Sequence, residues 1–137
     1  DIGLANPNAL VIANSCFQAV NVIGNPESRI LLSETAVYLA VSPKSNSTYS
    51  AINEALAFVK KTGNLPVPLH LRNAPTKLMK DLDYGKEYKY AHSYDGNFVD
   101  QDFLPEEIKD QKFYQPGNNA VEKKIYDELK KKWSGKY

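Results

Sequence analysis

Few residues in this chain are able to do acid–base, nucleophilic or metal chemistry. The 137 residues include two histidines, His70 and His92, and one cysteine, Cys16. Neither histidine lies in an H-x-x-x-H or C-x-x-C frame, so the usual spacing of zinc ligands is missing. The sequence also lacks a glycine-rich phosphate loop and a G-x-S-x-G nucleophile elbow. We therefore predict no catalytic, cofactor-binding or metal-binding residue in this chain.

His70 and Arg72 leave two interpretations open. They alternate with Leu69 and Leu71 along a proline-rich segment, so both point to the same side of it. Two adjacent donors of this kind can bind an anion or a partner. They can equally hydrogen-bond carboxylates or carbonyls and pin the segment to the helices. The second interpretation is favoured, because buried backbone groups usually find such partners.

Aromatic side chains crowd residues 84–116, a long segment rich in turns. A long loop in a compact domain is usually held by its own side chains, and we expect Tyr88, Tyr90 and His92 to be such pins. In the alternative interpretation, these tyrosines and the neighbouring lysines stack on single-stranded nucleic acid. Carboxylates in the same region would repel phosphates, which favours structural packing. These are Asp81, Asp83, Glu87, Asp95, Asp100 and Asp102.

The elements that position these residues begin with a stretch that has no charge between Asp1 and Glu27. Its pattern predicts one helix at residues 7–23, with Asn6 as its cap and Gly24 as its stop. A helix with almost no charge on any face is normally buried, either in a core or against another subunit. Within this helix we expect Cys16 to be a small core residue.

Three neutral amides, Asn14, Gln18 and Asn21, fall at positions i, i+4 and i+7 and form one stripe on this helix. Amides can hydrogen-bond across an interface without the desolvation cost of charges. The stripe can face another part of the same chain or a neighbouring subunit, and the sequence leaves both open. The predicted interface residues are Asn14, Phe17, Gln18, Asn21, Tyr38 and Tyr49.

Periodicity predicts four further helices, at residues 29–40, 45–63, 76–82 and 119–134. The helix at 45–63 carries an apolar seam, and the last helix is amphipathic. Between them we expect an extended, PPII-like segment at 66–72 and a short hairpin with a tight turn within residues 88–97. The predicted fold is a mainly α single domain. It has a helical core at 7–62, an extended and looped aromatic segment at 64–118 and a C-terminal amphipathic helix.

The bulk composition excludes several classes of protein. The formal net charge of +1 gives no global field that would point to nucleic acid. The single cysteine excludes an internal disulfide and fits a reducing compartment. No run of about eighteen apolar residues predicts a membrane span, so we expect a cytoplasmic protein. The abrupt start without a methionine suggests a piece of a longer protein.

Six segments, taken in order, resemble one known family, the RarA/MgsA replication-associated recombination ATPases. They are Asp1-Ile-Gly-Leu-Ala-Asn-Pro, Ala36-Val-Tyr-Leu-Ala-Val-Ser-Pro-Lys-Ser-Asn, Pro66-Val-Pro-Leu-His-Leu-Arg-Asn-Ala, Tyr88-Lys-Tyr-Ala-His, Phe103-Leu-Pro and Phe113-Tyr-Gln-Pro. The resemblance covers essentially the whole chain and is to the C-terminal part of these proteins. Two mild departures are Ala91, where the family usually has proline, and Phe98, where it often has tryptophan.

The resemblance implies a parent AAA+ ATPase, related to clamp-loader subunits, that uses ATP and magnesium. The parent would act on DNA at stalled or damaged forks, with replication proteins such as single-strand binding protein. Its Walker motifs would precede Asp1, and residues 1–6 would be the remnant of the junction with the ATPase lid. Residues 1–137 would form a collar-like domain that holds subunits together as a homotetramer and has no catalysis of its own. The alternative is a docking module for nucleic acid or a partner protein.

Overall fold

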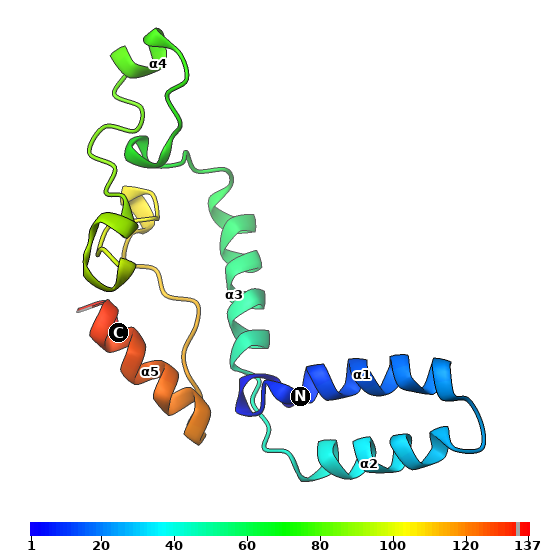
Figure 1. The fold of residues 1–137 in the computed structure, drawn as a ribbon. Coiled ribbons are helices and arrows are strands. Elements are labelled where there is room, and N and C mark those ends of the chain that lie inside the picture. The colour runs from blue at the N-terminus through cyan, green and yellow to red at the C-terminus, as the bar shows by residue number, and fades with distance from the viewer. Residues whose placement is uncertain (134) are drawn as a thin grey trace. The chain divides into compact units, whose positions relative to one another are not determined.

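The computed structural model describes residues 1–133 and 135–137, and all of its regular elements are helices (Figure 1). The prediction of a mainly α chain is confirmed. The α-helices are α1 (Asn8–Ile23), α2 (Ser28–Val41), α3 (Ser47–Thr62), α4 (Lys77–Asp81) and α5 (Ala120–Lys132). Each begins and ends within three residues of its prediction. The predicted end of the last helix, at Ser134, lies outside the described residues.

The chain divides into two compact units. The first unit contains residues 1–54 and 113–128, and the second contains residues 55–112 and 129–137. Helices α3 and α5 therefore each contribute residues to both units. That residues 1–137 act as a single domain stays a prediction.

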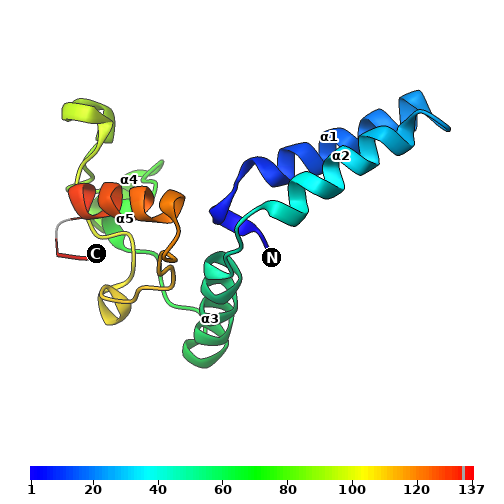
Figure 2. The ribbon, with the colours of Figure 1, turned by 90° about the horizontal axis from the view of Figure 1, so that it is seen from below.

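Helices α1 and α2 form an antiparallel hairpin in the first unit and lie side by side in both views (Figures 1 and 2). Small side chains make up the buried part of their contact, namely Ala9 and Cys16 from α1 and Ser28 from α2. The Cys16 thiol lies 3.6 Å from the carbonyl oxygen of Leu31 and donates to it. The expectation that Cys16 is a small core residue is confirmed. Many of the larger apolar side chains of both helices, such as Leu10, Val22 and Val41, are left on the outside.

The prediction that Asn6 caps the first helix is wrong. Pro7 stands at the cap position, and no side chain caps this helix. The Asn6 amide instead reaches across the chain and donates to the hydroxyl groups of Tyr38 and Ser42, each at 3.0 Å. The Asn6 side chain therefore makes two hydrogen bonds to residues more than thirty positions away in sequence and does not make the local capping bond. The stop at Gly24 is confirmed, since Gly24 has φ +71° and its N–H donates to the carbonyl of Val20 at 3.0 Å.

The predicted hairpin within residues 88–97 does not form. Two short 3-10 helices, Ala91–Ser93 and Asp95–Asn97, take its place. Gly96 and Asn97 both have positive φ, +67° and +53°, so the tight turn exists without flanking strands. A further 3-10 helix, Leu69–Leu71, interrupts the segment predicted to be extended. In both places the alternating pattern lacks a neighbouring strand to pair with, and a local turn satisfies the backbone instead.

Candidate interaction surface

The outer face of α1 exposes several large apolar side chains. Leu10 is 79% exposed, Phe17 69% and Val22 86%. Asn14, Gln18 and Asn21 are also exposed. The spacing of these residues places the three amides in a stripe, with Leu10 and Phe17 along one edge and Val22 along the other. This face, defined by these six residues, is called the amide face below.

The amide face has no partner within the hairpin. The side-chain amide of Asn21 donates to the carbonyl of Phe17 in its own helix at 3.0 Å. The residues of α1 that turn towards α2 are on the opposite side of the helix, around Ala9 and Cys16. A charge-free helix face of this kind, left open to water, is typical of a surface that another protein covers.

The outer face of α2 is likewise apolar. Ile30, Val37 and Val41 recur at i, i+7 and i+11, and Val41 is 76% exposed. Helix α2 is therefore not buried on all sides within this chain. The hairpin buries only its small inner residues, and both of its outer faces remain in solvent. Burying one such side chain fully is worth about 1.5–3 kcal/mol, so a few of them can support a stable contact.

The apolar seam of α3 is exposed as well. It contains Tyr49, Ile52, Leu56 and Val59, each more than half exposed. The side of α3 that is less accessible carries small residues instead, with Ser47 buried and Ala51 and Ala55 partly buried. The sequence predicted the apolar seam correctly, but it did not predict that the opposite side of α3 is the one covered by the rest of the chain.

Tyr38 and Tyr49, the other two predicted interface residues, do not belong to the amide face. Tyr38 is partly buried, and its hydroxyl accepts from the Asn6 amide on the inner side of the first unit. Tyr49 is 69% exposed near the start of α3. The structure thus groups Asn14, Phe17, Gln18 and Asn21 on one face and leaves these two tyrosines elsewhere.

In the second unit, His70 and Arg72 bond to backbone carbonyls. The Nε2 atom of His70 lies 2.7 Å from the carbonyl oxygen of Asp102. The Arg72 guanidinium donates from Nε to the carbonyl of Val67 at 2.6 Å and from a terminal nitrogen to the Tyr84 hydroxyl at 3.2 Å. It also lies 5.0 Å from the centre of the Tyr84 ring. Both side chains therefore join segments of the second unit that are separate in sequence.

The remaining predicted pins are more open. Tyr88 and Tyr90 are each more than half exposed. The rings of Tyr90 and His92 contact each other with centroids 5.1 Å apart. A larger aromatic cluster surrounds Trp133, whose ring meets Phe98 at 5.0 Å and Phe103 at 5.8 Å in edge-to-face geometry. Trp133 therefore joins two rings of the looped segment, in a geometry that aromatic pairs prefer.

Glu122 is the residue that the sequence interpretation missed. It lies in the first turn of α5 and is fully buried. Its carboxylate accepts hydrogen bonds from the hydroxyls of Ser47 and Tyr114. Its backbone N–H donates to the side-chain oxygen of Asn119 at 2.9 Å, while the Asn119 amide donates back to the carboxylate. The Asn119-Ala-Val-Glu122 spacing of a capping box was the signal that could have found it.

The environment of Glu122 stabilises its charged form. Burial alone would raise the pKa of the Glu122 carboxyl group. Hydrogen bonds outweigh this effect and lower the pKa from 4.5 to about 2; the donors are Ser45, Ser47, the Gly117 backbone N–H and Asn119. A buried, fully bonded carboxylate of this kind joins the start of α5 to the start of α3 and the segment before it.

The described part of the chain contains neither a cluster of metal ligands nor a membrane-spanning helix. Among residues 1–133 and 135–137, no three or more His, Cys, Asp or Glu side chains gather where they could hold a metal ion. Within the same residues, no helix combines the length and the apolar character needed to cross a membrane.

Comparison with known proteins decides the family. A family model described as "MgsA AAA+ ATPase C terminal" matches residues 1–133. The chain belongs to this family. It is the C-terminal domain of a RarA/MgsA-type AAA+ ATPase, and the expected resemblance is confirmed.

Relatives of this MgsA-type domain occur in bacteria and in a eukaryote. Replication-associated recombination protein A of Coxiella burnetii is 46% identical over 94% of this chain and 30% of its own length. The Escherichia coli K12 protein of the same name is 39% identical over 94% of this chain and 29% of its own length. ATPase WRNIP1 of Dictyostelium discoideum is 46% identical over 84% of this chain and 13% of its own length. The chain thus spans less than a third of the length of these relatives.

Proposed function

We propose that this MgsA-type domain holds copies of its parent ATPase together, and that the amide face of α1 is the contact. The observation that carries the proposal is the chemistry of this face. Three exposed amides run between exposed Leu10, Phe17 and Val22, with no charged side chain among them. Apolar side chains supply the free energy of association, and the amides supply hydrogen bonds that fix the register.

The absence of charge on the amide face favours another copy of the same chain as its partner. A self-complementary contact places a surface against its own copy, so any charge close to the symmetry axis would meet a like charge. Neutral amides avoid this repulsion because each carries both a donor and an acceptor. An amide stripe can therefore pair with a second amide stripe across a twofold axis.

The wider role follows from the resemblance and from the names of the relatives. The parent would be an ATP- and magnesium-dependent AAA+ ATPase in the cytoplasm that acts on DNA in replication-associated recombination and repair. It would act as a homotetramer, together with replication proteins such as single-strand binding protein. In this scheme ATP hydrolysis belongs to the part of the parent outside this domain, and the domain sets the number and arrangement of ATPase modules.

Light scattering after size-exclusion chromatography of the full-length protein tests the proposal. Phe17→Asp places a charge on the amide face, and we expect it to weaken association by at least about 30-fold, because central apolar anchors carry most of the free energy of an interface. Leu78→Asp is the matched control, since Leu78 on α4 is 68% exposed and Phe17 is 69% exposed. A variant Phe17→Asp with the mass of the unaltered assembly would contradict the proposal.

The nucleic-acid docking alternative has one observation in its favour, the exposed rings of Tyr88, Tyr90 and Phe103. A polar cavity in the same unit argues against binding of nucleic acid there. Its volume is about 450 Å³, and three carboxylates, Glu87, Asp100 and Asp102, line it beside His70 and Lys89. Titration with labelled single-stranded DNA at low salt distinguishes the two functions. Salt-dependent binding that Lys89→Ala abolishes would favour docking.

A further inference from the structure

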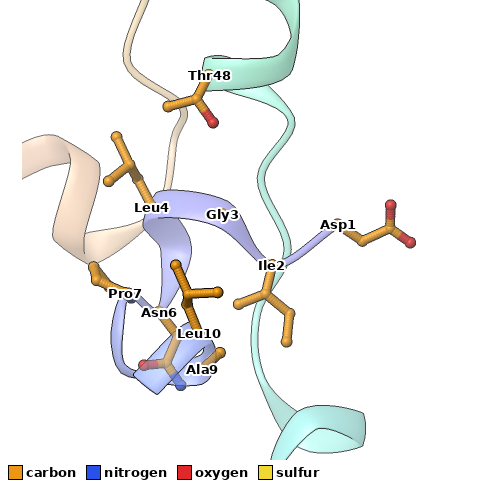
Figure 3. A pocket seen from close by; sticks show the side chains of 9 residues that line it. All are labelled: Asp1, Ile2, Gly3, Leu4, Asn6, Pro7, Ala9, Leu10 and Thr48. Carbon is orange, nitrogen blue, oxygen red and sulfur yellow. The ribbon is translucent and has the colours of Figure 1, made fainter. Parts of the chain in front are cut away.

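An apolar hollow lies at the first residues of the chain, in the first unit. Its volume is about 610 Å³, and its apolar lining includes Ile2, Leu4, Pro7 and Leu10, with Thr48 at the edge (Figure 3). Figure 3 shows the side chains of Leu4 and Leu10 among those that surround the first turns of the chain. Leu10 is 79% exposed although it lines this hollow, so the hollow has an uncovered apolar wall.

The backbone that forms this hollow is anchored to the first unit. The N–H of Ser45 donates to the carbonyls of Asp1 and Ile2, at 3.0 and 3.1 Å. Gly3 has φ +52°, and a Cβ atom at this position would lie 2.7 Å from the carbonyl oxygen of Ser45. These contacts leave no room for a side chain at Gly3, and they fix the first residues against the segment before α3. The hollow is therefore built by anchored backbone and does not depend on a mobile terminus.

The comparisons indicate what can fill the hollow. The family model describes the C-terminal part of an AAA+ ATPase, and this chain spans less than a third of the length of its relatives. In such a protein, the part that precedes this C-terminal domain enters it through the residue that corresponds to Asp1. Residues that enter there are covalently held beside the hollow. Their effective concentration at that site is in the millimolar range, so modest apolar contacts suffice to seat them.

We propose that the hollow is the seat of the segment that immediately precedes Asp1 in the full-length protein, which packs an apolar face against Leu4 and Leu10. The seat makes a rigid joint. A segment held against residues 2–10 moves with the α1–α2 hairpin, because Ser45 and Tyr38 bind the same first residues. The ATPase side of the protein would then be coupled mechanically to the amide face, without a flexible linker between them. This proposal rests on the family assignment and does not require self-association.

Cysteine labelling in the full-length protein tests this proposal. Leu10→Cys reports on the hollow and Leu78→Cys is the control, because both leucines are similarly exposed in this domain, 79% and 68%. Both variants carry Cys16→Ala, and peptide mass spectrometry follows the maleimide reaction at each site. We expect the Leu10→Cys site to react at least about 10-fold more slowly than the Leu78→Cys site. Equal rates at the two sites would overturn the proposal.

A second copy of the chain is the competing occupant, because Leu10 also belongs to the amide face. Repeating the labelling with Phe17→Asp separates the two occupants. If the preceding segment fills the hollow, protection of the Leu10→Cys site persists in this variant whatever its mass. Loss of protection together with loss of the assembly would assign the hollow to a neighbouring copy and overturn the proposal. A photo-cross-linker attached at the Leu10→Cys site of the Phe17→Asp protein gives a second test. It should form cross-links to residues before Asp1. Cross-links only to other regions would also overturn the proposal.

Discussion

The hydroxyl of Ser47, in the first turn of α3, donates a hydrogen bond to the buried carboxylate of Glu122, 75 residues further along the chain. The same carboxylate accepts from Tyr114 and from the Asn119 amide. Ser45, beside Ser47, binds the carbonyls of Asp1 and Ile2. One acidic side chain therefore joins α5 to the start of α3, next to the segment that anchors the first residues of the chain.

Replacing this carboxylate should destabilise the fold. Glu122→Gln keeps the shape of the side chain but removes its charge and places an amide donor against the hydroxyl and amide donors. We expect the free energy of unfolding in urea to fall by about 2 kcal/mol or more, since hydrogen bonds to charged groups are worth about 1.5–3 kcal/mol each. The exposed Glu54→Gln serves as the control and should change it by less than about 0.5 kcal/mol. If Glu122→Gln lowered the free energy of unfolding by no more than the control does, the buried hydrogen bonds would contribute nothing to stability.

The pH dependence of stability should report on the same group. The pKa of Glu122 is lowered from 4.5 to about 2 by the folded structure, so folding favours its charged form. The stabilisation is therefore fully present above about pH 5 and is lost as the pH falls towards 2. Its size is on the order of 3 kcal/mol. Urea unfolding from pH 7 to pH 2.5 should show a steeper loss for the unaltered protein than for Glu122→Gln, and parallel curves would contradict this account.

The anchor at the first residues predicts a strong effect of a single methyl group. In Gly3→Ala, the new Cβ atom would lie 2.7 Å from the Ser45 carbonyl oxygen, at a backbone φ of +52° that already strains alanine. Gly24→Ala isolates the backbone part, because Gly24 has φ +71° with no atom within 4 Å of the added Cβ. Strain at such a φ costs about 1–2 kcal/mol. We expect Gly3→Ala to lower stability by at least about 1 kcal/mol more than Gly24→Ala, measured by urea unfolding.

Equal losses in these two alanine variants would mean that Ser45 moves away without cost. The first residues would then be a loose terminus, and the rigid joint proposed above would lose its basis. The comparison is therefore independent of any measurement of assembly.

The amide stripe should tolerate an apolar side chain better than a charged one. Gln18→Glu differs from the native residue by one polar atom but brings a charge into the proposed contact, where its desolvation is uncompensated. Gln18→Met has a similar length and no charge. We expect Gln18→Glu to weaken association at least about 10-fold at pH 7 and Gln18→Met to weaken it less, as measured by sedimentation velocity. Equal affinities for the two variants would place Gln18 outside the contact.

Much of the helical architecture could be predicted from the sequence, because its signals are local. Gly24 and Pro43 mark helix ends, and the uncharged stretch before Glu27 contains one helix, as expected. The failures have non-local causes. Asn6 was expected to cap α1 but bonds Tyr38 and Ser42 instead. The hairpin expected within residues 88–97 had no strand to pair with, and turns formed.

Some features of the candidate surface could likewise be predicted from local signals, and others could not. The amides of Asn14, Gln18 and Asn21 share a face because of helical spacing alone, and this could be read from the sequence. Periodicity cannot say which side of a helix its own chain covers. The structure answers this for α1, where small inner residues pack on α2 and the amides face solvent. The capping-box spacing of Asn119 and Glu122 is a local signal, but the burial of Glu122 depends on Ser47 in another helix and was not predictable.

Sedimentation equilibrium of the full-length protein over a wide range of concentrations tests the central claim most directly. If the amide face joins copies of the chain, the unaltered protein should have a mass of four chains at tens of micromolar, and Phe17→Asp should shift it towards smaller species. Leu78→Asp should leave the mass unchanged. A single-chain mass for the unaltered protein at these concentrations would contradict the claim, as would a Phe17→Asp assembly as stable as the original.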